Sequence, residues 1–155
     1  MKSGPLDLSS LFHEGAVVDL RPGDKEGALR ELCAITAESP RVRDGAAFCR
    51  AIFEREKLVS TGIGIGVAIP HVKIPSVEDY VITVGRAAHG IDFDAIDGLP
   101  VRLIFMIAAS DQQTSEFVRV LAAIVKLIKT PGIQARLLEA AMPADFCAVL
   151  REACP

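Results

Sequence analysis

One short segment of the chain combines a reactive side chain with an unusually bare backbone. Residues 61–71 read TGIGIGVAIPH, in which Gly62, Gly64 and Gly66 precede an apolar run that ends at His71. A neutral imidazole can attack phosphorus through a free ring nitrogen, and its usual pKa of about 6.5 leaves it largely neutral at pH 7. The glycines leave main-chain N–H groups unshielded, which suits an anion. The segment therefore indicates a candidate anion or phosphoryl site at His71.

Plainer interpretations of the same segment stay open. Glycines also allow two strands to cross closely, and a histidine after an apolar strand is often a hydrogen-bonded structural residue. Pro70 stiffens the approach to His71, and the apolar residues 67–69 favour the neutral ring by excluding water. GIGIG does not match the GxGxxG spacing, and the chain has no GxxxxGK[ST] motif. The sequence therefore predicts neither a dinucleotide site nor a P-loop.

Other kinds of catalytic or metal site fit the sequence less well. It has no GxSxG motif for a hydrolase nucleophile, and its three histidines lack HExxH or another paired ligand spacing. The acidic segment IDFDAIDG (91–98) lacks the glutamate that closes a calcium loop, so we interpret it as a solvated turn. The cysteines form no CxxC pair and are predicted to be buried free thiols: Cys33, Cys49, Cys147 and Cys154. We therefore expect no metal site.

Composition limits the class of protein and its partners. The length of 155 residues predicts a single domain over 1–155. Half of the residues are hydrophobic and 24% are charged, a globular balance, and the net charge of -3 argues against a nucleic-acid partner. No signal peptide and no apolar run long enough for membrane insertion is visible. We therefore expect a cytoplasmic location.

Hydrophobic periodicity predicts an alternation of helices and strands. We expect helices over 24–39, with Asp24 as its cap, and from Asp44 to residue 58, then strands over 81–87 and 101–109. The continuous apolar run of the second strand indicates that both of its faces are covered. A long helix is predicted over 115–128, and short ones over 132–141 and 143–152. Helices thus flank the strands at both ends of the chain, which predicts a layered α/β domain.

The string EREKLVSTGIGIGVAIPHVK (54–73) resembles a known phosphohistidine segment. It is similar to that of the fructose, mannitol and nitrogen type IIA domains of the bacterial phosphoenolpyruvate phosphotransferase system, and residues 91–110 resemble the family's later strand and following loop. The resemblance implies a mixed β-sheet flanked by helices on both sides. It also implies that His71 accepts a phosphoryl group from the histidine of HPr or of a nitrogen-branch relative.

The resemblance also assigns roles to neighbouring residues. The family's site arginine matches Arg55, which would neutralise the phosphoryl oxygens. Thr61 and the backbone N–H groups of the three glycines would act as neutral donors to the same oxygens, with Lys73 as an accessory cation. For Arg55 the alternative is a solvated charge at a helix end.

One position departs from the family's pattern. Many members have a second histidine at the start of the late helix, where it hydrogen-bonds the phosphorylated ring or its phosphate. Here that position falls on Phe117, or on Glu116 if the register slips by one residue. Neither residue can donate as a histidine does, so we expect the lifetime of the phospho-form or the direction of transfer to differ.

Three functions fit these observations. The first is a phosphoryl-accepting regulatory protein of the nitrogen type, which needs no cofactor and whose phospho-state controls binding to a downstream target. The second is a fructose-type transport component that passes phosphate to a IIB domain. The third is a degenerate binding module that is never phosphorylated. In the first two a carrier must dock near His71, so we expect an apolar collar from Ile63, Ile65 and Val72.

Overall fold

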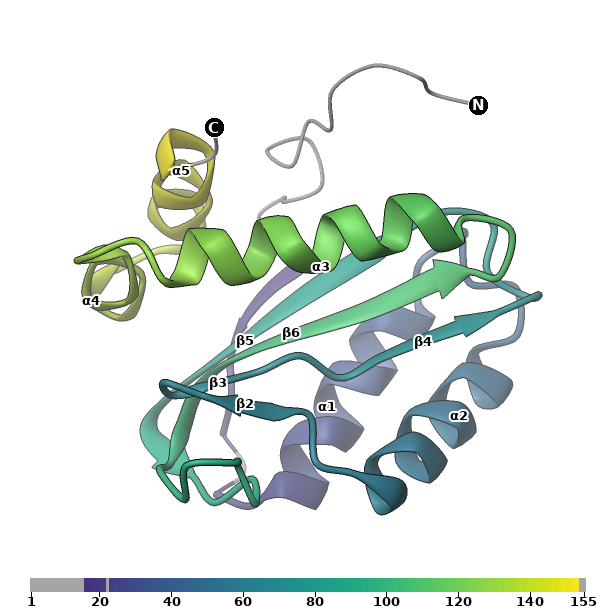
Figure 1. Ribbon diagram of the computed structural model, residues 1–155, viewed down its shortest axis with the longest axis horizontal. Helices are drawn as coiled ribbons and strands as arrows, with labels where there is room; N and C mark the ends of the chain where they lie inside the picture. The colour runs from purple at the N-terminus through teal and green to yellow at the C-terminus, as the bar shows by residue number, and fades with distance from the viewer. Residues whose placement is uncertain (1–15, 22, 154–155) are drawn as a thin grey trace.

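Five helices and a six-stranded sheet make up the part of the chain that the structure describes. The computed structural model describes residues 16–21 and 23–153 (Figure 1). The strands are β1 (Val17–Asp19), β2 (Gly62–Gly64), β3 (Val67–Ala68), β4 (His71–Ile74), β5 (Val81–Ile91) and β6 (Val101–Ser110). The helices are α1 (Lys25–Ala37), α2 (Gly45–Leu58), α3 (Thr114–Ile128), α4 (Ile133–Glu139) and α5 (Pro143–Ala153).

The sheet is mixed, and β6 is its central strand. The strand order is β1-β5-β6-β3-β2, and β4 also pairs with β6. β5 is antiparallel to β6, whereas β3 and β4 are both parallel to it and follow one another along the same edge. Pro70 lies between them and has no N–H, so the ladder is interrupted there, although its carbonyl still accepts the N–H of Ile107 at 2.9 Å. This interruption places His71 at the start of a new strand.

Aspartate side chains fix the starts of the first two helices. The Asp24 carboxylate accepts the N–H of Gly27 at 2.9 Å, and the Asp44 carboxylate accepts the N–H of Ala47 at 3.0 Å. Each bond satisfies a helix N–H that has no partner within the helix. The predicted starts of both helices are therefore confirmed.

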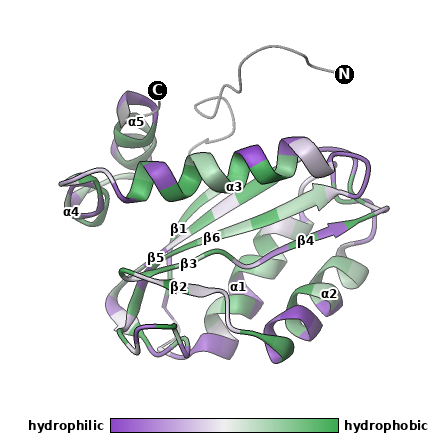
Figure 2. Ribbon diagram, in the orientation of Figure 1, coloured by the Kyte–Doolittle hydropathy of each residue, from purple (hydrophilic) through white to green (hydrophobic). Residues whose placement is uncertain are grey.

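The two faces of the sheet pack against different helices. Along β6, Leu103, Phe105 and Ile107 belong to the core shared with α3, α4 and α5. The alternate residues Ile104 and Met106 belong to the core shared with α1 and α2. Figure 2 shows mostly hydrophobic colour along β6 and hydrophilic colour on much of β4. The predicted α/β class, with a mixed sheet and helices on both sides, is confirmed.

The short strands and the full length of β5 were not predicted from the sequence. β2 and β3 form an antiparallel hairpin of three and two residues, and β5 extends to Ile91 where the pattern predicted an end at 87. These pieces are too short or too rich in glycine to show a period-2 pattern. Their pairing is decided by contacts with β6 and with each other.

The cysteine prediction holds in part. Cys33 and Cys147 are buried free thiols, as predicted, but Cys49 is only half-buried, and Cys154 lies outside the described residues. Burial raises the pKa of the Cys33 thiol well above its ordinary value, which disfavours the reactive thiolate.

Candidate functional site

His71 is the first residue of β4 and is partly buried. In the β4–β6 ladder it lies opposite Ile107. Its Nδ1 is 2.6 Å from the carbonyl oxygen of Ile69. A carbonyl can only accept, so Nδ1 must carry the proton of the neutral ring, and Nε2 keeps its lone pair. The backbone thus selects the tautomer that leaves Nε2 available as a nucleophile.

The surroundings of His71 favour its neutral form. Burial is the main cause that lowers the pKa of His71 below its usual value, and the hydrogen bond to Ile69 opposes it. Among nearby charges, Arg55 and Lys73 lower the pKa and Glu56 raises it. The imidazole is therefore uncharged at pH 7, as nucleophilic attack requires.

This shift predicts how stability depends on pH. The unfolded chain takes up a proton on His71 at a higher pH than the folded protein does, so protonation favours unfolding. The stability from neutral His71 is complete above the unfolded pKa of about 6.5 and is lost as the pH falls toward the folded value. In urea unfolding, the free energy of unfolding of the wild type, measured relative to that of His71→Gln, should therefore fall as the pH decreases below about 6.5. A difference that stays constant with pH would contradict the assignment.

Arg55 supplies positive charge next to His71. It lies in the last turn of α2, and its positive charge is one of those that lower the pKa of His71. Its hydrogen bond to the carbonyl of Val59 is long, at 3.4 Å. Within the described residues no carboxylate forms an ion pair with Arg55. Its fork of donors is thus available to an anion on His71.

Phe117 and Lys73 complete the surroundings of the imidazole. The ring of Phe117, in the first turn of α3, has its centroid 5.3 Å from that of His71 at an interplanar angle of 45°. The Nζ of Lys73 lies over the same Phe117 ring, 5.5 Å from its centroid. The aromatic ring thus excludes water from one side of His71 and holds a cation near it. Of the two alternatives, Phe117 is the residue that contacts His71.

Comparison with known proteins decides the family. The family model described as "Phosphoenolpyruvate-dependent sugar phosphotransferase system, EIIA 2" matches residues 10–153. The chain belongs to this family. The resemblance drawn from residues 54–73 is thereby confirmed.

Relatives of this IIA protein come from two branches of the system. The PTS system fructose-specific EIIA component of Haloferax volcanii is 34% identical over 148 residues, which cover 96% of this chain and 92% of the relative. The nitrogen regulatory protein of Bradyrhizobium diazoefficiens is 36% identical over 124 residues, 80% of each chain. The crystal structure of nitrogen regulatory protein IIA-Ntr from Neisseria meningitidis superposes with a TM-score of 0.84 at 29% identity, covering 92% of this chain and 98% of that chain.

Thr61 of this IIA protein uses both of its donors on one carboxylate. Its N–H donates to Oε1 of Glu56 at 2.9 Å and its hydroxyl donates to Oε2 at 2.8 Å, and only 5% of Thr61 is exposed. A phosphoryl group would have to compete with Glu56 for either donor. Direct donation from Thr61 to phosphate stays a prediction, and the geometry favours an indirect role.

The structure does not bring the glycine turn to His71. Gly64 and Gly66 have φ values of 90° and 79° and form the turn between β2 and β3. Along β6, the partner of Val67 is Leu103 and that of His71 is Ile107, four residues or about 13 Å further on. Figure 1 likewise shows this turn at the end of the hairpin away from β4.

Gly62 has a packing reason of its own. A Cβ at this position would lie 2.9 Å from the Cα and the Cβ of Ala95, which is too close for any other residue without movement. Its N–H donates to the hydroxyl of Ser60 at 3.1 Å. Close packing, which the sequence left open as an alternative, thus accounts for Gly62, and phosphate binding by the N–H groups of the three glycines stays a prediction.

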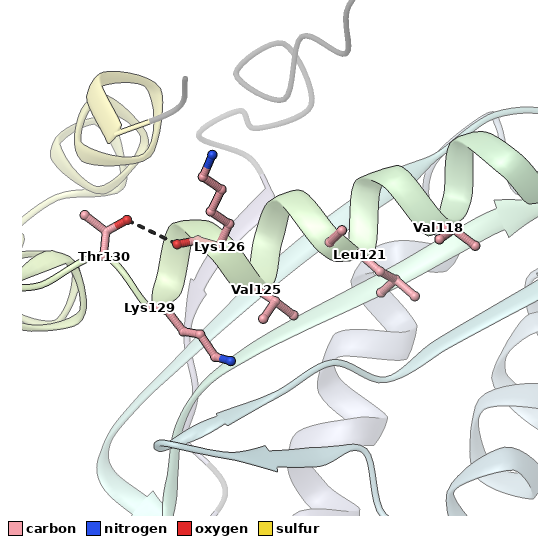
Figure 3. A pocket seen from close by; sticks show the side chains of 7 residues that line it. Val118, Leu121, Val125, Lys126, Lys129 and Thr130 are labelled. Atoms are coloured by element: carbon pink, nitrogen blue, oxygen red, sulfur yellow. Dashed lines mark hydrogen bonds between the residues drawn. The ribbon is translucent and has the colours of Figure 1, made fainter.

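An apolar face of the IIA protein lies beside the site on α3. Val118, Leu121 and Val125 line an open hollow along the helix, with Lys126 and Lys129 at its far end (Figure 3). Val118 directly follows Phe117 and is 60% exposed. In contrast, the residues expected to form an apolar collar are arranged differently. Ile63 and Ile65 are exposed near the β2–β3 turn, and Val72, next to His71, packs against the core.

Two residues of the site region received no role from the sequence. Glu56 continues the buried stripe of α2 formed by Phe48 and Ile52, and Lys25 pairs with its Oε1 at 2.9 Å. The sequence did contain a signal for Glu56, because it follows Phe48 and Ile52 at a spacing of four residues and so lies on the apolar side of the helix. A buried carboxylate needs a cation or several donors.

Neither a cluster of metal ligands nor a membrane-spanning helix is found in residues 16–21 and 23–153. There, no three His, Cys, Asp or Glu side chains gather as ligands for an ion. None of the helices in the same ranges is long and apolar enough to cross a bilayer.

Proposed function

We propose that this IIA protein accepts a phosphoryl group on Nε2 of His71 from the phosphohistidine of an HPr-like carrier. The observation that carries the proposal is the bond from Nδ1 to the Ile69 carbonyl, because it leaves Nε2 unprotonated in a neutral ring. The positive charge of Arg55 and Lys73 nearby suits the arriving phosphoryl oxygens. Membership of the phosphotransferase family supports the same chemistry.

The transfer step needs only the two proteins. The Nε2 lone pair attacks phosphorus in line, the new N–P bond forms, and the N–P bond on the carrier breaks with its electron pair returning to the carrier's imidazole. The Nδ1 proton of His71 stays in place, bonded to the Ile69 carbonyl, which stabilises the charge that develops on the ring. Arg55 neutralises the phosphoryl oxygens.

The donor can be identified by labelling. The protein is incubated with phosphoenolpyruvate, Enzyme I and either HPr or its nitrogen-branch relative, and the intact mass is followed with time. We expect one phosphoryl group to be added, faster with one carrier than with the other. No addition with either carrier would contradict the proposal.

Docking of the carrier on the apolar face of α3 gives a separate prediction. Val118→Asp should slow phosphorylation by about tenfold, because a charge would be desolvated at the centre of the contact. Met142→Asp is the matched control, since Met142 is also 60% exposed but lies between α4 and α5. Rates are measured at carrier concentrations well below saturation. Equal rates for both variants would place the contact elsewhere.

A regulatory role is the finer part of the proposal. Phosphorylation adds a charge of about -1.5 to -2 on the surface, enough to create or disrupt a docking site. The nitrogen regulatory relatives and the superposition on the Neisseria protein favour this branch. A downstream target should then bind the unphosphorylated and the phosphorylated protein differently in a pull-down. The proposed location is the cytoplasm, as the sequence predicts.

A transport role is the second candidate. The fructose-specific relative from Haloferax volcanii, which aligns over 96% of this chain, favours it. The phosphoryl group would then pass from His71 to a IIB domain. Restoration of fructose uptake in cells that lack their own IIA component would favour transport over regulation.

The third candidate is a binding module that is never phosphorylated. Its only specific support is Phe117. A phenylalanine offers no donor to a phosphate on His71. This candidate is favoured if every partner binds His71→Asp as it binds the wild type, and if incubation with phosphoenolpyruvate, Enzyme I and a carrier leaves binding unchanged.

A further inference from the structure

A buried carboxylate connects three parts of the fold behind the candidate site. Glu56, at the end of α2, is only 8% exposed. Both of its oxygens accept hydrogen bonds from Thr61, and Oε1 also pairs with Nζ of Lys25. Lys25 is held in turn by the ring of Phe93, 4.8 Å from Nζ. The cluster therefore fixes the segment at Thr61 relative to α1 and α2.

Hydrogen bonds continue from this cluster to the imidazole. The carbonyl of Thr61 accepts the N–H of Ile69 at 3.0 Å, and the carbonyl of Ile69 accepts Nδ1–H of His71 at 2.6 Å. Ile69 is thus held at both its N–H and its C=O. A displacement of Thr61 would move the acceptor that selects the tautomer of His71.

The pairing of Glu56 also keeps Arg55 available. The two residues are adjacent on α2, so their side chains point in different directions around the helix. Lys25 neutralises Glu56 from the α1 side. Without Lys25, the Glu56 carboxylate would be an uncompensated buried charge.

We propose that Glu56, with Lys25 as its counter-ion, is a positioning residue for phosphoryl acceptance at His71. The inference rests on the proposed function. Glu56 holds Thr61, and Thr61 holds Ile69 so that the Ile69 carbonyl keeps the proton on Nδ1 and Nε2 free. Neither Glu56 nor Lys25 contacts the phosphoryl group.

The test combines a spectroscopic and a kinetic measurement on the full chain. Imidazole ¹⁵N shifts report which nitrogen of His71 carries the proton, and intact mass reports the rate of phosphorylation by HPr or its relative. In Glu56→Ala we expect a larger population of His71 with the proton on Nε2, and a rate lower by about tenfold because both hydrogen bonds that hold Thr61 are lost. Glu26→Gln is the control, because it removes a carboxylate from an exposed pair with Arg30 and should change neither.

Milder variants cover the case in which Glu56→Ala fails to fold. Thr61→Val removes only the hydroxyl bond to Glu56 and should lower the rate by about threefold, whereas Thr61→Ser should restore it. Lys25→Met should raise the pKa of His71, because the Glu56 charge is then uncompensated, and Glu56→Gln should lower it. These opposite directions would not follow from a general loss of stability.

The outcomes separate this inference from the proposed function. If the variants fold but keep the wild-type tautomer, pKa and rate, Glu56 has no positioning role. If the wild type is not phosphorylated at all, the proposed function fails, and the ¹⁵N measurements still show whether the tautomer depends on Glu56.

Discussion

His71→Ala is expected to abolish phosphorylation of the protein. The variant lacks Nε2 of His71, the ring nitrogen that the bond from Nδ1 to the Ile69 carbonyl leaves unprotonated and nucleophilic. The fold should persist, because His71 is partly exposed and its backbone pairing with β6 does not need the side chain. After incubation with phosphoenolpyruvate, Enzyme I and a carrier, the intact mass should stay that of the unmodified chain.

His89→Ala is the matched control for this experiment. His89 is exposed on β5 and is not near the position of the family's reactive histidine. This variant should be phosphorylated at the wild-type rate. Labelling of His71→Ala, or loss of labelling in His89→Ala alone, would assign the acceptor to another residue.

Arg55→Ala is expected to slow phosphorylation by about 100-fold, the effect of removing one preorganised charged donor from a transition state. Arg55→Lys should recover part of the rate, since an ammonium keeps the charge but not the planar fork. The rate is followed by quenching samples and measuring the phosphorylated fraction by mass. The pKa of His71 should rise in Arg55→Ala, because Arg55 is one of the charges that lower it.

Arg50→Ala provides the comparison on the same helix. Arg50 is exposed on α2 and lies five residues before Arg55. Its loss should leave the rate unchanged. If Arg55→Ala is no slower than Arg50→Ala, then Arg55 is a solvated charge at the helix end, the alternative that the sequence left open.

Local patterns predicted the long elements well. Asp24 and Asp44 marked the starts of α1 and α2 because their capping bonds are made within three residues. The run 101–109 predicted a strand covered on both faces because each side of β6 packs against helices. Matching to the family's pattern placed Phe117 at the position that contacts His71.

Long-range contacts decided what the sequence could not show. The approach of Gly62 to Ala95 gives this glycine a packing role that the spacing alone could not separate from anion binding. The two bonds from Thr61 to Glu56 and the pairing of Glu56 with Lys25 join residues from separate elements. A hydrophobic pattern shows that Glu56 faces inward, but not which donors meet it.

Neutral His71 is expected to accept the phosphoryl group through Nε2. The most direct test is to phosphorylate the ¹⁵N-labelled wild-type protein with its carrier and to record the imidazole nitrogens of His71 by NMR. We expect ³¹P coupling at Nε2, with the proton retained on Nδ1. Coupling at Nδ1, or a phosphoryl group on any other residue, would contradict it.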